Sequence, residues 1–227
     1  MKQKLQYWTL VLFYGVILWF GLVTTAQANE LPQSKTTHIL RRLSFGTNSQ
    51  QLKAVNSQGI EAYIQSQLEP ESIPESPIVD EYLKEFNADY QEPLKLHKKH
   101  VASKKKLRNA AQKSDEIRRR LQKNASSLKV EARNRAIQIH LARAIYSSRQ
   151  LQEMMVDFWF NNFNVFANKS TVSFWLSDYE NAIRDRALGN FRDLLEVTAS
   201  NPAMLIYLDK EFNTDPNSPL AKKRYKG

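Results

Sequence analysis

The sequence predicts an all-α protein, an irregular multi-helix domain, and three observations lead to that prediction. Apolar residues recur at three- to four-residue spacing through most of the chain after its first 28 residues, which is the period of an amphipathic helix and not the alternation of a strand. Capping residues, glycines and prolines bound these periodic segments. Cysteine is absent, so packing must hold the helices together without disulfides or thiolate-ligated metals.

A positive start and a long apolar run open the chain. Lys2 and Lys4 come first, and the run YWTLVLFYGVILWFGLV follows, with Ala26 and Ala28 after it in an A-x-A site. These are the three parts of a secretory signal peptide cleaved after Ala28. Residues 1–28 are therefore predicted to direct the chain to the periplasm, the cell envelope or the outside of the cell. An apolar run of this length can also stay in the bilayer as an uncleaved anchor, but the A-x-A site favours cleavage.

Short helices and a proline-rich linker are expected over residues 29–93. SKTTHILRRLSFG predicts one helix, NSQQLKAVNSQG a second capped by Asn48 or Ser49, and GIEAYIQSQL a third after Gly59. Three prolines then remove backbone donors and restrict the residues before them. An extended linker is expected there, followed by a helix over about residues 79–90.

The positive charge of the chain is concentrated in one segment. Leu94–Lys123 contains twelve lysines and arginines against two acidic residues, a net charge of +10, which equals the formal charge of the whole chain. Its few apolar residues do not make a stripe wide enough for core packing. Residues 94–129 are therefore expected to be a basic insertion, either helical or disordered.

A solvated charged face is the simplest interpretation of this insertion. The alternative is a site for an anionic membrane surface or an acidic envelope polymer, because each cation near a charged surface adds to the attraction. The residues of that polyanion site would be Lys98, Lys99, Lys104, Lys105, Lys106, Arg118, Arg119 and Arg120. Nucleic acid is a poorer ligand, since the segment lacks interleaved aromatic residues for stacking.

The strongest helical periodicity lies in residues 130–212, the expected helical core. The side chains predicted to face inward are Ile137, Leu141, Ala144 and Ile145 on one helix, and Leu151, Met154, Met155, Phe158 and Trp159 on the next. A last helix should start with Pro202 at its first position, where the missing N–H has no intrahelical partner to lose. Residues 213–227 are expected to be a turn-rich basic tail.

Three stretches carry a family resemblance. They are HILRRLSFGT, RQLQEMMVDFWFNNFNVF and DYENAIRDRALGNFRDLLEVTASNPAMLIYLD. Together they resemble the large bacterial exported family catalogued as domain of unknown function 1800, over most of the chain after the signal peptide. The resemblance carries no established activity over to this chain. It does imply a partner, since members are often encoded beside another exported family of unknown function.

The chain departs from the resembling family in two respects. Members are about twice as long and continue with a helix like NENYARELLELHTLG, so this chain is expected to be the N-terminal part only, a split gene or a fragment. In addition, the family motif commonly reads NHFNV, whereas Asn162 stands in the place of its histidine here. An amide neither titrates nor binds metal as imidazole does.

Two sets of residues are candidate site residues. The catalytic candidates are Asp157, Asp178, Tyr179 and Arg184, because two carboxylates can act as acid and base where burial separates their pKa values. The simpler interpretation is i,i+4 pairing of Glu180 with Arg184 on a helix surface. The ligand-binding candidates are Trp159, Asn161, Asn164 and Trp175, a set that resembles a carbohydrate-binding surface. Core packing of the aromatic rings is the simpler interpretation there.

The remaining patterns indicate neither a metal nor a cofactor. His97 and His100 lie among lysines whose field opposes a divalent cation, so a solvated helix face is expected. H-E-x-x-H, G-x-S-x-G, Walker A and G-x-G-x-x-G patterns are absent. The sequence therefore predicts an exported interaction or structural component of the envelope. One alternative is a polysaccharide-directed envelope enzyme whose site a missing C-terminal part completes, and another is an inactive fragment.

Overall fold

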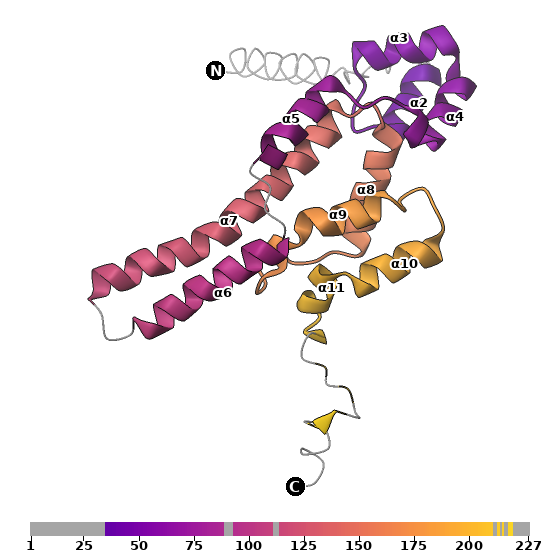
Figure 1. The fold of residues 1–227 in the computed structure, drawn as a ribbon. Helices are drawn as coiled ribbons and strands as arrows, with labels where there is room; N and C mark the ends of the chain where they lie inside the picture. The colour runs from indigo at the N-terminus through magenta and orange to yellow at the C-terminus, as the bar shows by residue number, and fades with distance from the viewer. Residues whose placement is uncertain are drawn as a thin grey trace, which may run out of the picture.

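The computed structural model describes residues 35–88, 93–110 and 114–210, together with residues 213, 215, 218 and 219. Over these residues the chain is helical and has no strand, so the all-α prediction is confirmed (Figure 1). The predicted signal peptide and its cleavage site lie outside the described residues. No described helix combines the length and the apolar character needed to cross a bilayer.

Three short helices form a small packed unit near the start of the described chain. They are α2 (Lys35–Leu43), α3 (Ser49–Gln58) and α4 (Ile60–Leu68). The Asn48 side chain accepts a hydrogen bond from the backbone N–H of Gln51 at 2.7 Å, and the Gln51 side chain accepts one from the N–H of Asn48 at 3.3 Å. This capping box confirms Asn48 of the two predicted caps. The buried residues of the unit are Leu40, Val55 and Tyr63.

The proline-rich segment and the basic segment follow. Pro70–Ser72 is the 3-10 turn η1, and Pro77 opens α5 (Pro77–Ala88). Two long helices then pack against each other as a hairpin, α6 (Pro93–Asn109) and α7 (Asp115–Tyr146). We call α6 and residues 115–129 of α7 the arm, because they project away from the remaining helices (Figure 1).

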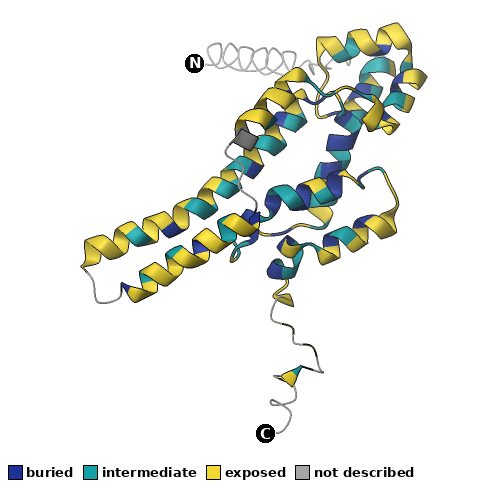
Figure 2. Cartoon of the chain, in the orientation of Figure 1, coloured by how far each residue is buried: buried dark blue, intermediate teal, exposed yellow. Residues whose placement is uncertain are grey.

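The arm is helical, which decides between the two expected states of residues 94–129. The boundary expected at residue 129 falls inside α7, which continues unbroken into the rest of the molecule. Figure 2 shows the arm almost wholly exposed, with a few buried positions between its two helices. Its packing is therefore limited to one narrow seam, as its weak apolar pattern predicts.

His100 lies at the base of this seam, and the prediction that it faces solvent is wrong. The side chain is buried, and its Nδ1 lies 2.9 Å from the carbonyl oxygen of Ala125 on α7. Its ring also packs against Phe174, with centroids 5.4 Å apart. The neighbouring lysines gave no sign of this burial, because it depends on a residue 74 positions away in sequence.

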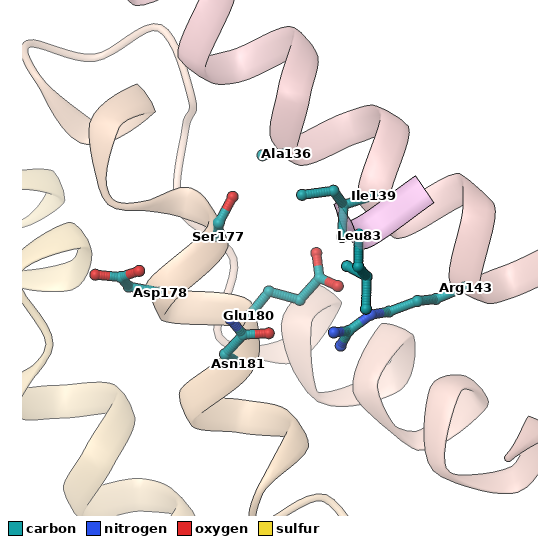
Figure 3. A pocket seen from close by; sticks show the side chains of 8 residues that line it. All are labelled: Leu83, Ala136, Ile139, Arg143, Ser177, Asp178, Glu180 and Asn181. Carbon is teal, nitrogen blue, oxygen red and sulfur yellow. The ribbon is translucent and has the colours of Figure 1, made fainter. Parts of the chain in front are cut away.

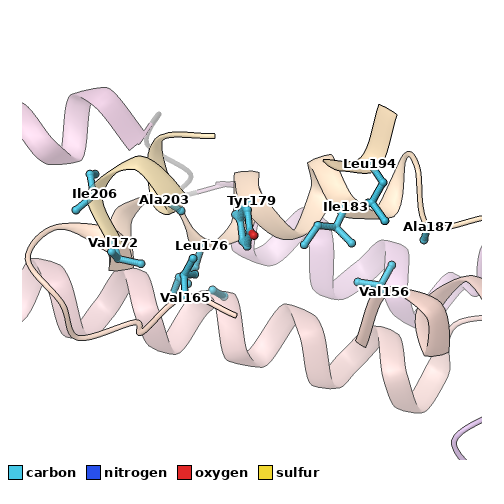
Figure 4. Close-up of a cluster of buried hydrophobic side chains, with 11 residues drawn as sticks. Val156, Val165, Val172, Leu176, Tyr179, Ile183, Ala187, Leu194, Ala203 and Ile206 are labelled. Carbon is cyan, nitrogen blue, oxygen red and sulfur yellow. The ribbon is translucent and has the colours of Figure 1, made fainter. Parts of the chain in front are cut away.

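The main core lies in the helices that follow the arm. They are α8 (Gln150–Asn162), the 3-10 turn η2 (Val172–Phe174), α9 (Leu176–Arg184), α10 (Phe191–Ser200) and α11 (Pro202–Tyr207). We call α8–α11 with residues 130–146 of α7 the body. Its buried residues include Val156, Val165, Val172, Leu176, Tyr179, Ile183, Ala187, Leu194, Ala203 and Ile206 (Figure 4). Pro202 is at the start of α11, as predicted, and the structure adds Asn201 as its cap.

The predicted inward face of α7 is wrong, and that of α8 is right only in part. Ile137, Leu141 and Ile145 of α7 are 48, 50 and 61% exposed, whereas Ala136 and Ala142 are buried. On α8, Met155 and Trp159 pack against the main core as predicted, but Phe158 is half exposed. The buried residues of α8 are Gln150, Gln152, Glu153 and Val156. Apolar spacing identifies a helix but does not say which face its neighbours use. Here the neighbours pack on the faces with small and ion-paired side chains.

Candidate functional site

A buried ion network joins α8 and α9. Nε and Nη2 of Arg184 donate to the two carboxylate oxygens of Glu153, each at 2.9 Å, and Nη2 also donates to Oε1 of Glu180 at 2.5 Å. None of these three side chains is more than 10% exposed. Bidentate guanidinium–carboxylate contact gives both strength and a fixed orientation. The network therefore locks the two helices in one register.

His140 extends the network to α7. Its Nδ1 lies 3.4 Å from Oε2 of Glu180, and its Nε2 lies 3.8 Å from Oδ1 of Asp157. The contact with Glu180 raises the pKa of His140, in spite of the opposing effect of burial. Burial by itself raises the pKa of Glu180, but His140 and Arg184 together bring that pKa below its ordinary value. Arg184 and His140 therefore both favour the ionised form of the Glu180 carboxylate.

A cavity of about 360 Å³ lies beside the network, between α5, α7 and α9 (Figure 3). Its walls are formed by Leu83, Ala136, Ile139, Arg143, Ser177, Asp178, Glu180 and Asn181. In Figure 3 the guanidinium of Arg143 reaches into it toward Glu180 and Asn181. Burial and the nearby charge of Arg184 lower the pKa of Arg143. The cavity thus has one basic residue, two acidic residues and two neutral polar residues on its walls.

The arm presents a different electrostatic site. All eight residues of the predicted polyanion site lie on α6 or α7 and are exposed. Arg118 pairs with Asp115 at 3.5 Å, and Asp115 is one of only two acidic residues in residues 94–123. Burial and the charge of Lys104 on the facing helix lower the pKa of Lys129. Positive charges from the two helices are therefore close enough to repel each other.

The ion network with its cavity and the basic arm both lie within a match to one protein family. A family model described as "Protein of unknown function (DUF1800)" matches residues 38–219. The chain belongs to this family. The DUF1800 match includes the arm, the ion network and the cavity, and it confirms the resemblance seen in the sequence. No curated protein and no solved structure matches the chain.

The four catalytic candidates occupy different environments in this DUF1800 protein. Asp157 and Arg184 both belong to the network around His140 and Glu180. Asp178 lines the cavity, but its carboxylate points away from Arg143 (Figure 3). Tyr179 is fully buried and donates to the carbonyl oxygen of Phe163 at 2.7 Å, and burial raises its pKa. Tyr179 is therefore a neutral core residue.

The Glu180–Arg184 pair predicted from i,i+4 spacing exists, but its expected place on the helix surface is wrong. Both side chains are buried, and Arg184 also pairs with Glu153 from α8. Glu153, His140 and Arg143 were not among the candidate residues. The only sequence signal for them is weak: each is a charged or titratable residue on a helix that packs in the core. Their spacing does not identify the residues with which they interact.

The ligand-binding candidates do not present their polar groups together. Trp159 donates from Nε1 to the carbonyl oxygen of Ala187 at 3.0 Å, and its ring stacks on Phe163. Asn161 donates its amide back to the carbonyl oxygen of Asp157 in its own helix at 2.9 Å. Trp175 packs against the main core, and Asn164 is exposed. The aromatic residues around Trp159 thus pack against the main core as well as against one another.

The described residues contain no group of three or more histidine, aspartate or glutamate side chains arranged to hold a metal ion. His140 has two carboxylates close to it, but they lie on opposite sides of the ring, one at each nitrogen. This geometry is that of a histidine bridging two carboxylates by hydrogen bonding or ion pairing. Its direct consequence is a link between α7, α8 and α9.

Proposed function

We propose that this protein is an exported interaction component of the cell envelope and that its arm binds an anionic lipid surface. The observation that carries the proposal is the projection of exposed, like-charged helices from an otherwise well-packed body. A solvated linker would not need two helices packed as a hairpin. The hairpin instead gathers cations from both helices, where a charged surface can meet several of them at once.

The energetics favour a surface over a small anion. Each lysine or arginine near an anionic membrane contributes about 1 kcal/mol, so the eight cations can bind strongly only if many of them face the surface together. The repulsion between Lys104 and Lys129 also falls when an anionic surface neutralises the arm. Such binding weakens as salt rises, because screening acts strongly on exposed charges.

A polysaccharide-directed envelope enzyme is the second candidate function. The observation that favours it is the cavity with two carboxylates, Asp178 and Glu180, on its wall. Glu180, however, is held ionised by Arg184 and His140, so it is poorly suited to donate a proton as a general acid. The arm therefore supports a function in binding better than the cavity supports one in catalysis.

Vesicle co-sedimentation tests the proposal. The full-length chain is mixed with vesicles of phosphatidylglycerol and phosphatidylcholine, and separately with phosphatidylcholine alone, which measures binding through any apolar segment. The arm variant carries Lys98→Gln, Lys105→Gln, Arg119→Gln and Arg120→Gln. The matched control carries Lys35→Gln, Arg41→Gln, Arg42→Gln and Lys53→Gln on α2 and α3, which removes the same charge elsewhere.

The quantity compared is the affinity for anionic vesicles beyond the affinity for phosphatidylcholine vesicles. We expect the arm variant to lose at least about tenfold of this additional affinity, since four cations near the surface contribute about 1 kcal/mol each. The α2–α3 control should lose much less of this additional affinity. Raised salt should remove the additional affinity of the unmodified chain. Equal loss in the two variants would mean that net charge alone drives binding. Unchanged binding of the arm variant would contradict the proposal outright. A soluble acidic polysaccharide that binds the arm while anionic vesicles do not would assign the arm to an envelope polymer instead.

A further inference from the structure

One guanidinium in the body faces a cavity and forms no ion pair with a carboxylate of the described residues. Arg184 has two carboxylates in contact, whereas Arg143 forms no ion pair with a described residue and its Nε has no hydrogen-bond partner. Its Nε is fully buried. Burying a charged group without a hydrogen-bond partner is unfavourable. An anion in the cavity would supply the missing partner.

We propose that the cavity between α5, α7 and α9 binds a small hydroxylated monocarboxylate, of the sugar-acid class, with Arg143 holding its carboxylate. The planar guanidinium matches the two oxygens of a carboxylate. Figure 3 shows the Arg143 head group directed into the cavity and not along its own helix. The volume of about 360 Å³ lies at the lower end of the range for small-molecule sites.

The other walls select the class of acid. Glu180 is an ionised carboxylate on the cavity wall, and it repels a phosphate dianion more strongly than a single carboxylate. A ligand with one negative charge placed at Arg143 is therefore preferred. This distinguishes the cavity from the arm, where cations outnumber acidic residues and a multiply charged ligand is favoured.

The neutral polar groups favour hydroxyls on the ligand. Ser177 and Asn181 are spaced i,i+4 on α9, so they lie on the same side of that helix. Oδ1 of Asn181 already accepts from Nη1 of Arg184 at 2.7 Å, which fixes the amide and leaves its NH2 group as the donor. A serine hydroxyl and an amide N–H pair well with ligand hydroxyls. Leu83 and Ile139 provide apolar surface for the carbon skeleton.

Titration calorimetry with three probes tests the assignment on the full-length chain. Glucuronate is the expected ligand, glucose is its uncharged analogue, and inorganic phosphate tests for a general anion site. The key variant is Arg143→Gln, which keeps hydrogen-bonding capacity and removes the charge. Arg42→Gln is the matched control, because Arg42 is an exposed arginine on α2 outside the cavity.

We expect glucuronate to bind and glucose to bind at least tenfold more weakly. Arg143→Gln should weaken glucuronate binding at least tenfold, and Arg42→Gln should leave it unchanged. Far-UV circular dichroism shows whether Arg143→Gln is folded. If it is not, Ser177→Leu decides, because it fills the cavity and leaves Arg143 in place, and it should abolish binding.

Three results would overturn the inference. The first is no heat of binding with glucuronate at millimolar concentration. The second is tighter binding of phosphate than of glucuronate, or equal binding of glucose, either of which rejects the monocarboxylate class. The third is unchanged glucuronate affinity in a folded Arg143→Gln or Ser177→Leu variant, which places the ligand elsewhere. None of these results depends on whether the arm binds vesicles, so the two proposals fail separately.

Discussion

The body and the arm use charged residues in opposite ways. In the body, Arg184 is buried and its cation is neutralised by Glu153 and Glu180, so the charges connect helices. In the arm, Arg119 and Arg120 are exposed and stand among other cations, so the charges add up to a surface. Arginine therefore stabilises the fold in one region and is available for binding in the other. Burial decides which role it has.

The sharpest contrast is expected from removing one arginine in each region. Arg184→Met should lower the free energy of unfolding by about 3–5 kcal/mol, because it leaves Glu153 and Glu180 buried without their cation. Arg120→Met in the arm should change it by less than about 0.5 kcal/mol, as for ordinary surface substitutions. Urea unfolding followed by circular dichroism measures both. A loss below about 1 kcal/mol for Arg184→Met would show that the network does not hold the helices.

Truncating an apolar side chain should separate the regions in the same direction. Leu194 on α10 is fully buried in the main core, and Leu194→Ala should cost about 2–5 kcal/mol. Ile117 on the arm is exposed, and Ile117→Ala should stay within about 0.5 kcal/mol. The same urea titration applies. If the two substitutions lower the free energy of unfolding equally, the arm is packed as tightly as the body, which would contradict the difference between the two regions.

A pH-dependent difference is expected at His140. Its folded pKa is raised above the value of free imidazole, mainly by Glu180. Its contribution to stability is therefore fully present below the unfolded pKa, about 6.5, and is lost as pH rises through the folded pKa. His140→Gln should thus destabilise the protein more in mildly acidic than in alkaline buffer. Urea unfolding of both chains over that pH range measures this. A difference that grows with pH would contradict it.

His100 should show the opposite sign, with a smaller effect. Burial, followed by Lys104, Lys129 and His97, lowers its pKa in the fold. Stability is then present above the unfolded pKa and is lost as pH falls through the folded pKa. Relative to His100→Gln, the unmodified chain should lose stability in acid. Nuclear magnetic resonance titration of the two imidazoles gives an independent check, since His140 should titrate above and His100 below the ordinary value.

Local structure was predictable where the signal is local. The cap of α3 and the start of α11 at Pro202 depend on residues within one helical turn. The sequence predicted Pro202 correctly and narrowed the cap to Asn48 or Ser49, of which the structure shows Asn48. The choice between helix and disorder in the basic segment was left open, because charge alone does not distinguish a solvated helix from a disordered chain.

Contacts between distant segments were not predictable from spacing. The stripe Ile137–Leu141–Ile145 indicates a helix correctly, but the helices that pack on α7 use its other side. In the same way, i,i+4 spacing identified Glu180 with Arg184 and missed Glu153, which is 31 residues from Arg184. A single sequence records which residues share a helix face, and it does not record which faces meet.

The most direct test of the difference between arm and body is amide hydrogen exchange followed by mass spectrometry on the full-length chain. Local opening should be easy in the arm, which has little buried apolar surface, and should approach global unfolding in α8–α10. We predict rapid exchange over residues 94–110 and 114–128 and protection at least about 100-fold greater over residues 151–160 and 176–198. Equal protection in the two regions would contradict the separation of a packed body from a displayed, charged arm.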